Sequence, residues 1–227
     1  MNDDDDDDLA DFRGSVRLFP LPNLVLFPRV MQPLHIFEPR YRQMTADALD
    51  DDRLIGIVRQ GPDGKSDGVK YDFEMVGCVG KIVAEQRLEG GRYNLLLRGV
   101  KRFLAVREIE SDKPYRQVTV DLLDEIPFVG AGHEEETYRQ RLFAAAPRWL
   151  PPQTLLQNEF KKLLSATLDL GMLADMITFT VPIDPKAKQV LLEELDIRKR
   201  LDQLLRLLEL KKAKAPPAKF PPDFSVN

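Results

Sequence analysis

The sequence is poor in the residues that most often bind metals or form disulfides. It contains one cysteine, Cys78, and two histidines, His35 and His133, in 227 residues. One cysteine excludes an intramolecular disulfide, and a structural zinc site needs more cysteine and histidine ligands than these. A site made of carboxylates alone stays open, although no spacing supports one. We therefore expect no bound metal and no other cofactor.

Long apolar segments are also missing. No apolar run approaches the roughly 18–20 residues that span a bilayer. The chain begins with Met1-Asn2 and six aspartates, which is unlike the basic start and apolar stretch of a secretory signal. The hydrophobic fraction of 43% is enough for a packed core in one large domain or two small ones. We expect a cytoplasmic protein that does not bind membranes.

Charge is concentrated at the two ends of the chain. Residues 1–12 hold seven aspartates and no basic residue, whereas residues 211–227 hold four lysines and one acid. The rest of the chain has 29 basic and 29 acidic residues. Nucleic-acid binders need a basic excess to neutralise phosphate, so this balance argues against nucleic acid as a partner. We expect residues 1–12 and the lysine- and proline-rich residues 213–227 to be disordered.

The first half of the chain has the pattern of a β domain. Strands are predicted over residues 16–19, 24–27, 31–37, 55–58, 78–87, 93–98, 100–109 and 118–122. The prolines of this region indicate short, bent strands rather than central ones. Gly90-Gly91 predicts a tight hairpin turn. One inserted helix is predicted from Pro39, which suits a first helical position, to about Leu49.

The second half has the pattern of packed helices. Apolar faces predict helices around Tyr138–Ala145, Leu156–Thr167 and Met172–Thr180. A last helix, capped by Asp184, is expected to continue without a break to about Leu210. Strands followed by helices predict an α+β fold. We expect a β domain over residues 13–126, with its one inserted helix, and a helical bundle over residues 127–212.

Motifs for nucleotide binding and serine catalysis are incomplete. Gly64-Lys65-Ser66 is similar to the end of a P-loop, but Arg59 stands where that motif needs its first glycine. A surface turn is the simpler interpretation. No serine lies in Gly-x-Ser-x-Gly. A serine–lysine pair built from distant residues stays open, yet nothing in the sequence supports one, so we expect no enzyme.

Two further residues have both a chemical and a simpler interpretation. His35 lies close in sequence to Glu38 and Arg40, so an acid–base pair is conceivable, but a histidine hydrogen-bonded between strand and helix is simpler. Cys78 lies between Gly77 and Val79 in a predicted strand. A small buried residue there is simpler than a reactive thiol, which needs an electropositive and partly exposed setting.

One long stretch is far more specific than these motifs. It is Leu18-Phe19-Pro20-Leu21-Pro22-Asn23-Leu24-Val25-Leu26-Phe27-Pro28, followed by Met31-Gln32-Pro33-Leu34-His35-Ile36-Phe37-Glu38-Pro39-Arg40-Tyr41. It resembles the opening of the N-terminal, or substrate-binding, domain of Lon proteases. The resemblance continues through residues 77–82, 91–95, 97–103, 173–175 and 188–193. It covers about residues 15–210.

This resemblance implies a PUA-like β pseudobarrel followed by a helical bundle. In full-length Lon proteases the domain precedes an ATPase module and a serine–lysine peptidase. The present chain ends at Asn227 and lacks a P-loop, so we expect neither activity. The resemblance implies a non-catalytic module that binds unfolded or damaged polypeptide, as an adaptor or modulator in protein quality control. Full-length Lon is a further candidate partner, and RNA binding by the PUA-like barrel is the alternative function.

We expect the polypeptide to bind at one turn of the fold. The candidate substrate-binding residues are Phe27, Pro28, Arg29 and Met31, with Phe37 and Tyr41 nearby. Phe37 and Tyr41 are also good candidates for the core. Binding would bury apolar side chains or add a strand to an open sheet edge. The sequence predicts no catalytic residue and no oligomeric state.

Overall fold

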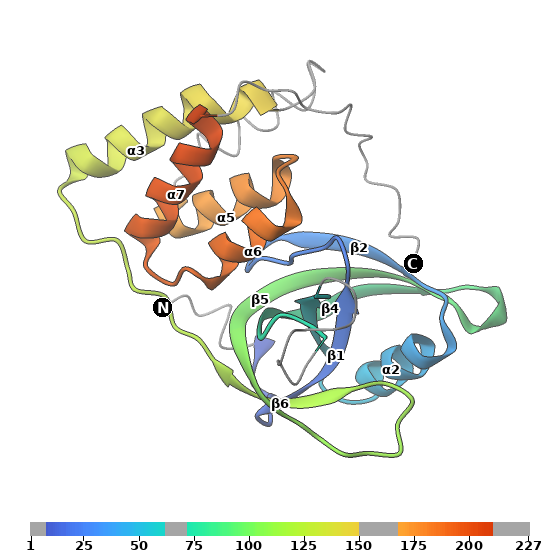
Figure 1. Cartoon of the computed structure of the whole chain (residues 1–227). Helices are drawn as coiled ribbons and strands as arrows, with labels where there is room; N and C mark the ends of the chain where they lie inside the picture. The colour runs from blue at the N-terminus through green and yellow to red at the C-terminus, as the bar shows by residue number, and fades with distance from the viewer. Residues whose placement is uncertain (1–7, 62–71, 150–167, 211–227) are drawn as a thin grey trace. The chain divides into compact units, whose positions relative to one another are not determined.

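The computed structural model describes residues 8–61, 72–149 and 168–210 (Figure 1). The chain divides into two compact units, the first ending at Leu123 and the second beginning at Asp124. Three expectations from the sequence lie outside the described residues. They concern the turn at Gly64-Lys65-Ser66, the helix at Leu156–Thr167, and the tails over residues 1–7 and 213–227.

The first unit is built on one six-stranded sheet. Its strands are β1 (Ser15–Leu21), β2 (Met31–Ile36), β3 (Leu54–Arg59), β4 (Val76–Arg87), β5 (Tyr93–Glu108) and β6 (Gln117–Leu122). Their order is β2-β5-β4-β3-β1-β6, and β5 also pairs with β6. Five strands therefore form a closed ring. The sixth strand, β2, pairs with the first part of β5, Tyr93–Arg98. The pairing of β1 with β3 is parallel and the others are antiparallel.

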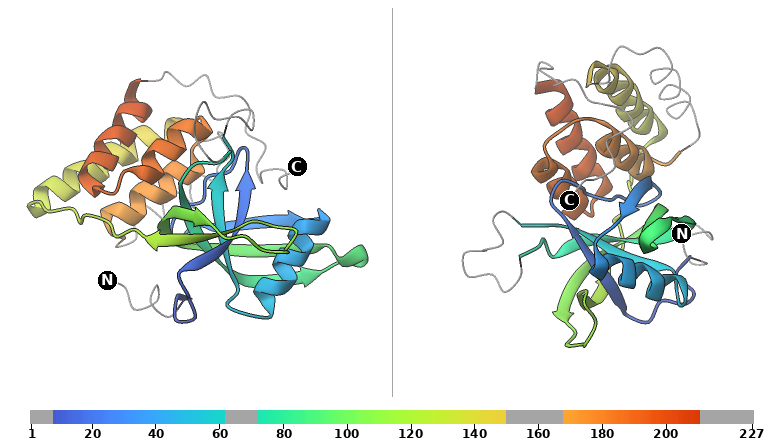
Figure 2. Two further views of the ribbon diagram at one scale, coloured as in Figure 1. Left: turned by 60° about the horizontal axis from the view of Figure 1, so that its bottom comes forward. Right: turned by 90° about the vertical axis from the view of Figure 1, so that its right-hand side faces the viewer.

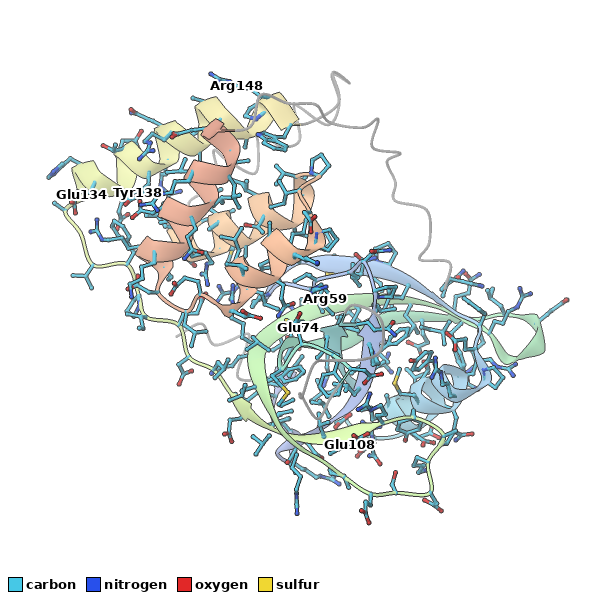
Figure 3. The ribbon with its side chains drawn as sticks, in the orientation of Figure 1. Arg59, Glu74, Glu108, Glu134, Tyr138 and Arg148 are labelled. Atoms are coloured by element: carbon cyan, nitrogen blue, oxygen red, sulfur yellow. The ribbon has the colours of Figure 1, made fainter. Side chains whose placement is uncertain are left out.

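Two apolar clusters hold this unit together, one on each face of β3. All six residues of β3 are buried. Leu54 and Val58 pack with Phe103 in one cluster, whereas Ile55 and Ile57 belong to the other. Side chains alternate between the two faces of a strand, and a strand covered on both faces is therefore apolar throughout. The exception is the last residue of β3, Arg59, which pairs with Glu74 (Figure 3).

The inserted helix α2 (Pro39–Leu49) covers the second cluster. Tyr41, Met44 and Ala48 lie on its buried face and pack in the cluster that contains Ile55 and Ile57. Figures 1 and 2 show α2 beside the strands of this unit in each view. The predicted hairpin is present between β4 and β5, where Gly90 and Gly91 both have φ of 71°. The helix and the hairpin are both confirmed.

The second unit consists of helices. They are α3 (Gly132–Ala145), the 3-10 turn η3 (Ala146–Trp149), α5 (Leu170–Thr180), α6 (Pro185–Glu193) and α7 (Ile197–Leu210). Asp169 and Asp184 cap α5 and α6 by accepting from the backbone N–H groups of Met172 and Lys186, each at 2.7 Å. With the sheet of the first unit, these helices confirm the predicted α+β class.

The predicted strand at residues 24–27 is wrong. This segment pairs with no strand, although Val25, Leu26 and Phe27 are buried. Prolines at positions 22 and 28 lack the N–H that a ladder needs, so the apolar run is buried as an irregular segment. An apolar run indicates that a segment is buried, but it does not by itself indicate that the segment pairs with a strand.

The last helix is two helices rather than one. It breaks at Glu194–Asp196, where Glu194 has an extended backbone. The N–H of Ile126 donates to the carbonyl of Leu195, and the N–H of Ile197 donates to the carbonyl of Ile126. These two bonds replace helical hydrogen bonds, which explains why helix-forming residues leave the helix here. A tertiary contact of this kind has no sequence pattern.

Two boundaries also differ from the sequence expectations. Residues 8–12 were expected to belong to the disordered acidic end, yet Leu9 and Phe12 pack against the apolar cluster that contains Phe103. The helix predicted around Tyr138–Ala145 is followed by a 3-10 turn that continues to Trp149. The indole N–H of Trp149 donates to the carbonyl of Leu208 at 3.1 Å, which fixes this turn against α7.

Candidate functional site

The six candidate binding residues differ greatly in exposure. Phe27 and Pro28 are buried, with no exposed surface on Phe27. Arg29 and Phe37 are half-buried, and Tyr41 is 6% exposed. Only Met31 is well exposed, at 44%. The structure therefore separates residues that shape the turn from the one that presents an apolar side chain to solvent.

The turn before Met31 is held by an unusual backbone at Arg29. Its φ is 62°, a left-handed value that non-glycine residues adopt at a cost. The Arg29 N–H donates to the Gly99 carbonyl at 2.7 Å, and the Gly99 N–H donates to the Val30 carbonyl at 2.9 Å. Two residues thus face one residue of β5, which is the arrangement of a β-bulge. A side chain at Gly99 would collide with the Phe27 carbonyl oxygen.

Strand β2, which follows this bulge, forms an open edge of the described sheet. It pairs with β5 on one side and ends the strand order on the other. Gln32, Leu34 and Ile36 face the core, whereas Met31 and Pro33 are exposed. Proline is tolerated on edge strands, where its missing N–H costs no ladder bond. Pro33 was therefore a sequence indication of this edge.

The pairing phase identifies the backbone groups that face away from β5. Bonded and non-bonded pairs alternate along an antiparallel ladder, and Val30 accepts from Gly99. This phase directs the backbone groups of Met31, Pro33 and His35 outward. The open edge accordingly offers the N–H group and the carbonyl of Met31 to an added strand, whereas the Pro33 carbonyl already accepts from Gln32 Nε2 at 2.6 Å.

A basic row lies beside Met31 on the same face of the sheet. Met31 pairs with Arg98, and Arg98 pairs with Lys81. The carboxylate of Asp8 forms an ion pair with Arg98, and Lys81 donates to the carbonyls of Asp8 and Asp52 at 3.3 and 2.8 Å. The last aspartate of the acidic run thus occupies this row.

A pocket of about 360 Å³ lies at the beginning of α2. Its buried walls are Leu18, Tyr41 and Tyr115, and Pro22 and Pro114 stand at its exposed rim. Arg40 and Glu38 form an ion pair with a separation of 2.9 Å between Nη2 and Oε2. This volume is near the lower end of the range for ligand pockets, about 300–1,000 Å³. Of the residues expected to bind, only Tyr41 lines it.

A second charged group closes one side of this pocket. Arg116 donates to Glu108 at 2.7 Å and pairs with Asp72. These hydrogen bonds raise the pKa of Arg116 and lower the pKa of Asp72. All four charged residues that line the pocket are therefore paired. Gln60, Pro114 and Arg116 come from distant parts of the sequence, so no local pattern could have predicted this pocket.

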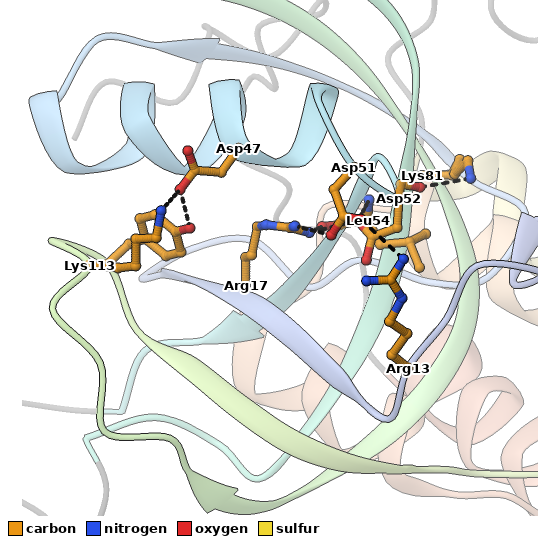
Figure 4. Close-up of polar contacts among 9 residues, drawn as sticks. Arg13, Arg17, Asp47, Asp51, Asp52, Leu54, Lys81 and Lys113 are labelled. Carbon is orange, nitrogen blue, oxygen red and sulfur yellow. Dashed lines mark hydrogen bonds and ion pairs between the residues drawn. The ribbon is translucent and has the colours of Figure 1, made fainter.

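Polar contacts fix α2 beside the segment before β6 (Figure 4). Asp47 accepts from Lys113 at 2.9 Å and from Tyr115 at 2.5 Å. Burial alone would raise the pKa of Asp47, but hydrogen bonds from Lys113, Tyr115 and Gln43 lower it overall. Figure 4 also shows Arg17 between Asp51 and Asp52, with both ion pairs at 2.6 Å. These contacts position the walls of the pocket.

The two candidate reactive residues have structural surroundings. Cys78 is completely buried, as expected, and its thiol lies 3.4 Å from the Val79 carbonyl. His35 Nδ1 lies 2.8 Å from Asn94 Oδ1, so one of its partners is on β5. Across residues 8–61, 72–149 and 168–210, no three histidine, cysteine or acidic residues are grouped as metal ligands.

None of the helices that the structure describes has the length and apolar character needed to cross a bilayer. Residues 15–209 match the family model of the ATP-dependent protease La (LON) substrate-binding domain. The match includes both units and nearly all described residues. This chain belongs to the Lon substrate-binding domain family.

Curated relatives of this Lon-type domain are Lon proteases. Lon protease from Syntrophus aciditrophicus is 30% identical over 203 residues, which are 85% of this chain and 25% of the relative. Lon protease 2 from Myxococcus xanthus is 28% identical over 195 residues, or 86% of this chain and 23% of the relative. The chain thus spans about a quarter of the length of these relatives.

Solved structures confirm the fold of the Lon-type domain. A Lon N-terminal domain protein from Xanthomonas campestris aligns with a TM-score of 0.63 and 23% identity, covering 86% of this chain and 98% of the other. The N-terminal domain of Lon protease from Mycobacterium avium complex aligns with a TM-score of 0.66 and 20% identity, covering 88% and 100%. The predicted family and the predicted α+β fold are therefore confirmed.

Proposed function

We propose that this Lon-type domain binds unfolded or damaged polypeptide without cutting it. Membership of the Lon substrate-binding family over residues 15–209 carries the proposal. The role as an adaptor or modulator in protein quality control, with or without a full-length Lon as partner, is part of the same proposal. A polypeptide ligand also agrees with the balanced charge of the chain between its two ends.

The open edge of β2 supports a specific mode of binding. An extended polypeptide can add to an unpaired edge through backbone hydrogen bonds, which do not depend on the side chains of the ligand. Unfolded chains differ in sequence, and this mode therefore suits a general substrate. Met31 adds an apolar contact at the start of the edge, where its side chain is 44% exposed. Pro33 removes one donor, which limits pairing with a second copy of the same edge.

The proposal is tested by measuring affinity for one protein in two states. Fluorescence anisotropy would measure the affinity of the domain for two labelled proteins of similar size and charge. One is permanently unfolded, such as a reduced and alkylated casein-like protein, and the other is stably folded. We expect saturable binding of the unfolded chain only. Equal binding of both proteins, or binding of neither, would contradict the proposed function.

A pair of variants tests the proposed place of binding. Met31→Ser removes the exposed apolar side chain of β2, and Val106→Ser is the matched control because Val106 is 51% exposed on β5. We expect Met31→Ser to weaken binding about three- to tenfold, as loss of one partly buried apolar side chain predicts. Val106→Ser should bind like the unchanged protein. Equal effects of the two variants would remove β2 from the proposal.

A further inference from the structure

The beginning of α2 has backbone donors without partners. Pro39 has no N–H, and the first helical hydrogen bond runs from the Arg42 N–H to the Glu38 carbonyl at 2.9 Å. Glu38 does not cap the helix, because its carboxylate pairs with Arg40 instead. The N–H groups of Arg40 and Tyr41 therefore remain available for an acceptor, as they are at uncapped helix starts. Both residues line the pocket.

Tyr41 provides a second, independent indication of a ligand. It is 94% buried, and its hydroxyl has no hydrogen-bond partner among the residues that the structure describes. Burial raises its pKa, and the charged groups that also act on the hydroxyl are Arg40, Glu38, Arg116 and Asp72. All four line the pocket, so the hydroxyl faces it. The ring of Tyr41 is buried, whereas its hydroxyl stays open to the pocket, where the acceptor of a ligand would replace water.

The chemistry of the pocket selects a neutral ligand with an acceptor and an apolar part. Its charged residues are paired with one another, so no net charge is left to attract an ion. Among the described residues, no partner is present for the two helical N–H groups, the Tyr41 hydroxyl and the side-chain amide of Gln60. Aromatic rings and prolines form the remaining walls. A peptide carbonyl beside a large apolar side chain satisfies both requirements.

The pocket directly continues the open edge of β2. Strand β2 ends at Ile36, and Glu38, which lines the pocket, follows two residues later. Two residues span at most about 7 Å. The end of β2 therefore lies close to the pocket, and an extended chain that adds to β2 and continues past Ile36 runs toward it. This continuity favours a polypeptide over a free small molecule.

We infer that the pocket at the start of α2 holds one large apolar side chain of the polypeptide bound along β2. The carbonyl of the same residue accepts from the N–H groups at the helix start and from the Tyr41 hydroxyl. This inference rests on the proposed function and adds a preference to it. The backbone pairing accepts any sequence, whereas the pocket selects an aromatic or long aliphatic residue at one position.

The test uses two tyrosines that line the same pocket. Tyr41→Phe removes an unpartnered hydroxyl, and Tyr115→Phe removes one that donates to Asp47 at 2.5 Å. Tyr41→Phe should leave the unfolding midpoint unchanged or raised, and it should weaken binding of an N-acetylated peptide with one central Phe about five- to tenfold. Tyr115→Phe should lower the midpoint. A purely structural role for Tyr41 would instead lower its midpoint and leave binding unchanged.

Peptides of matched sequence complete the experiment. The same peptide with Ala in place of Phe should bind the unchanged protein as weakly as the Phe peptide binds Tyr41→Phe. Tyr138→Phe, in the second unit, is the control for loss of a tyrosine hydroxyl, because Tyr138 donates to Asp202 at 2.8 Å. Its peptide affinity should not change.

The two proposals fail in different ways. Binding of unfolded protein with no preference for Phe over Ala, and no effect of Tyr41→Phe, would overturn the pocket and leave the proposed function standing. No binding of any unfolded polypeptide would overturn both. Binding of free phenylalaninamide as tightly as the peptide would assign the pocket to a small molecule and also overturn the inference.

Discussion

The buried charge of Arg200 contributes to the stability of the second unit. Arg200 has no exposed surface, and it lies between Asp175, which is 2% exposed, and Glu125. Its Nε lies 3.4 Å from Asp175 Oδ1, and its Nη1 donates to the Glu194 carbonyl at 3.0 Å. The ion pair connects the start of the unit to α5 and to the break between α6 and α7. Removing one partner of such a pair leaves a buried charge without compensation.

Arg200→Met is therefore predicted to destabilise the second unit by about 3–5 kcal/mol. Trp149 is the only tryptophan and is buried in this unit, so its fluorescence reports this unfolding transition directly. The double variant Arg200→Met with Asp175→Asn removes one stranded charge and should regain part of the loss. If Arg200→Met were as stable as the unchanged protein, the role of the Arg200 ion pair in stability would be contradicted.

The contact between Tyr115 and Asp47 predicts a dependence on pH. Hydrogen bonds lower the pKa of Asp47 in the folded protein, so its contribution to stability is present above the ordinary carboxyl pKa. The contribution is lost as the pH falls through the lowered folded value. Tyr115→Phe should cost about 1 kcal/mol at pH 7 and raise the pKa of Asp47 toward its ordinary value.

Urea unfolding and NMR titration of the Asp47 carboxyl measure these two effects. The difference in unfolding free energy between the unchanged protein and Tyr115→Phe should shrink below about pH 4. Asp47→Asn is the control, since it removes the titrating group. A difference that stays constant down to acid pH would show that Asp47 is not the partner that matters.

At the scale of elements, caps and breaks define the helices more than apolar periodicity does. The sequence predicted Pro39 and Asp184 as helix starts, because proline and aspartate act through local geometry. It did not predict the break at Glu194–Asp196, which depends on backbone bonds from Ile126. The segment 24–27 was wrongly predicted as a strand because its apolar residues do not show whether a pairing partner exists. Local chemistry is visible in a sequence, whereas a partner distant along the chain is not.

The cap of α6 gives a prediction for one element. Asp184 Oδ1 accepts from the Lys186 N–H at 2.7 Å. Asp184→Ala should lower the unfolding free energy of the second unit by about 1 kcal/mol, and Asp184→Asn should lose much less because its amide oxygen can still cap. Trp149 fluorescence in urea checks both variants. Equal losses for Ala and Asn would indicate that charge, not capping, is the cause.

At the scale of the whole molecule, the family and the fold could be predicted, and the binding surface only in part. The motif from Leu18 to Tyr41 is specific because it encodes the bulge, the edge strand and the helix start together. Met31 was among the expected binding residues and is exposed, but Phe27 and Pro28 are buried. Pocket residues such as Gln60 and Tyr115 meet only in the folded chain. The predicted domain limits, cytoplasmic location and absence of catalysis stay predictions.

RNA binding, the alternative function, gains no support from the comparisons. Lon proteases and Lon N-terminal domains are the relatives and structures that match. The basic row beside β2 is occupied by Asp8, which pairs with Arg98. Added salt should therefore change polypeptide affinity only modestly, in contrast to the steep dependence expected for phosphate contacts.

Hydrogen–deuterium exchange of the full chain, with and without a saturating unfolded polypeptide, tests the central claim most directly. The outward N–H group of Met31 has no partner on β5 in the ladder phase described above, so it should exchange rapidly in the free protein. We predict that the polypeptide protects this amide and those at the start of α2. Protection confined to the helices of the second unit, or no protection at all, would contradict binding at the β2 edge.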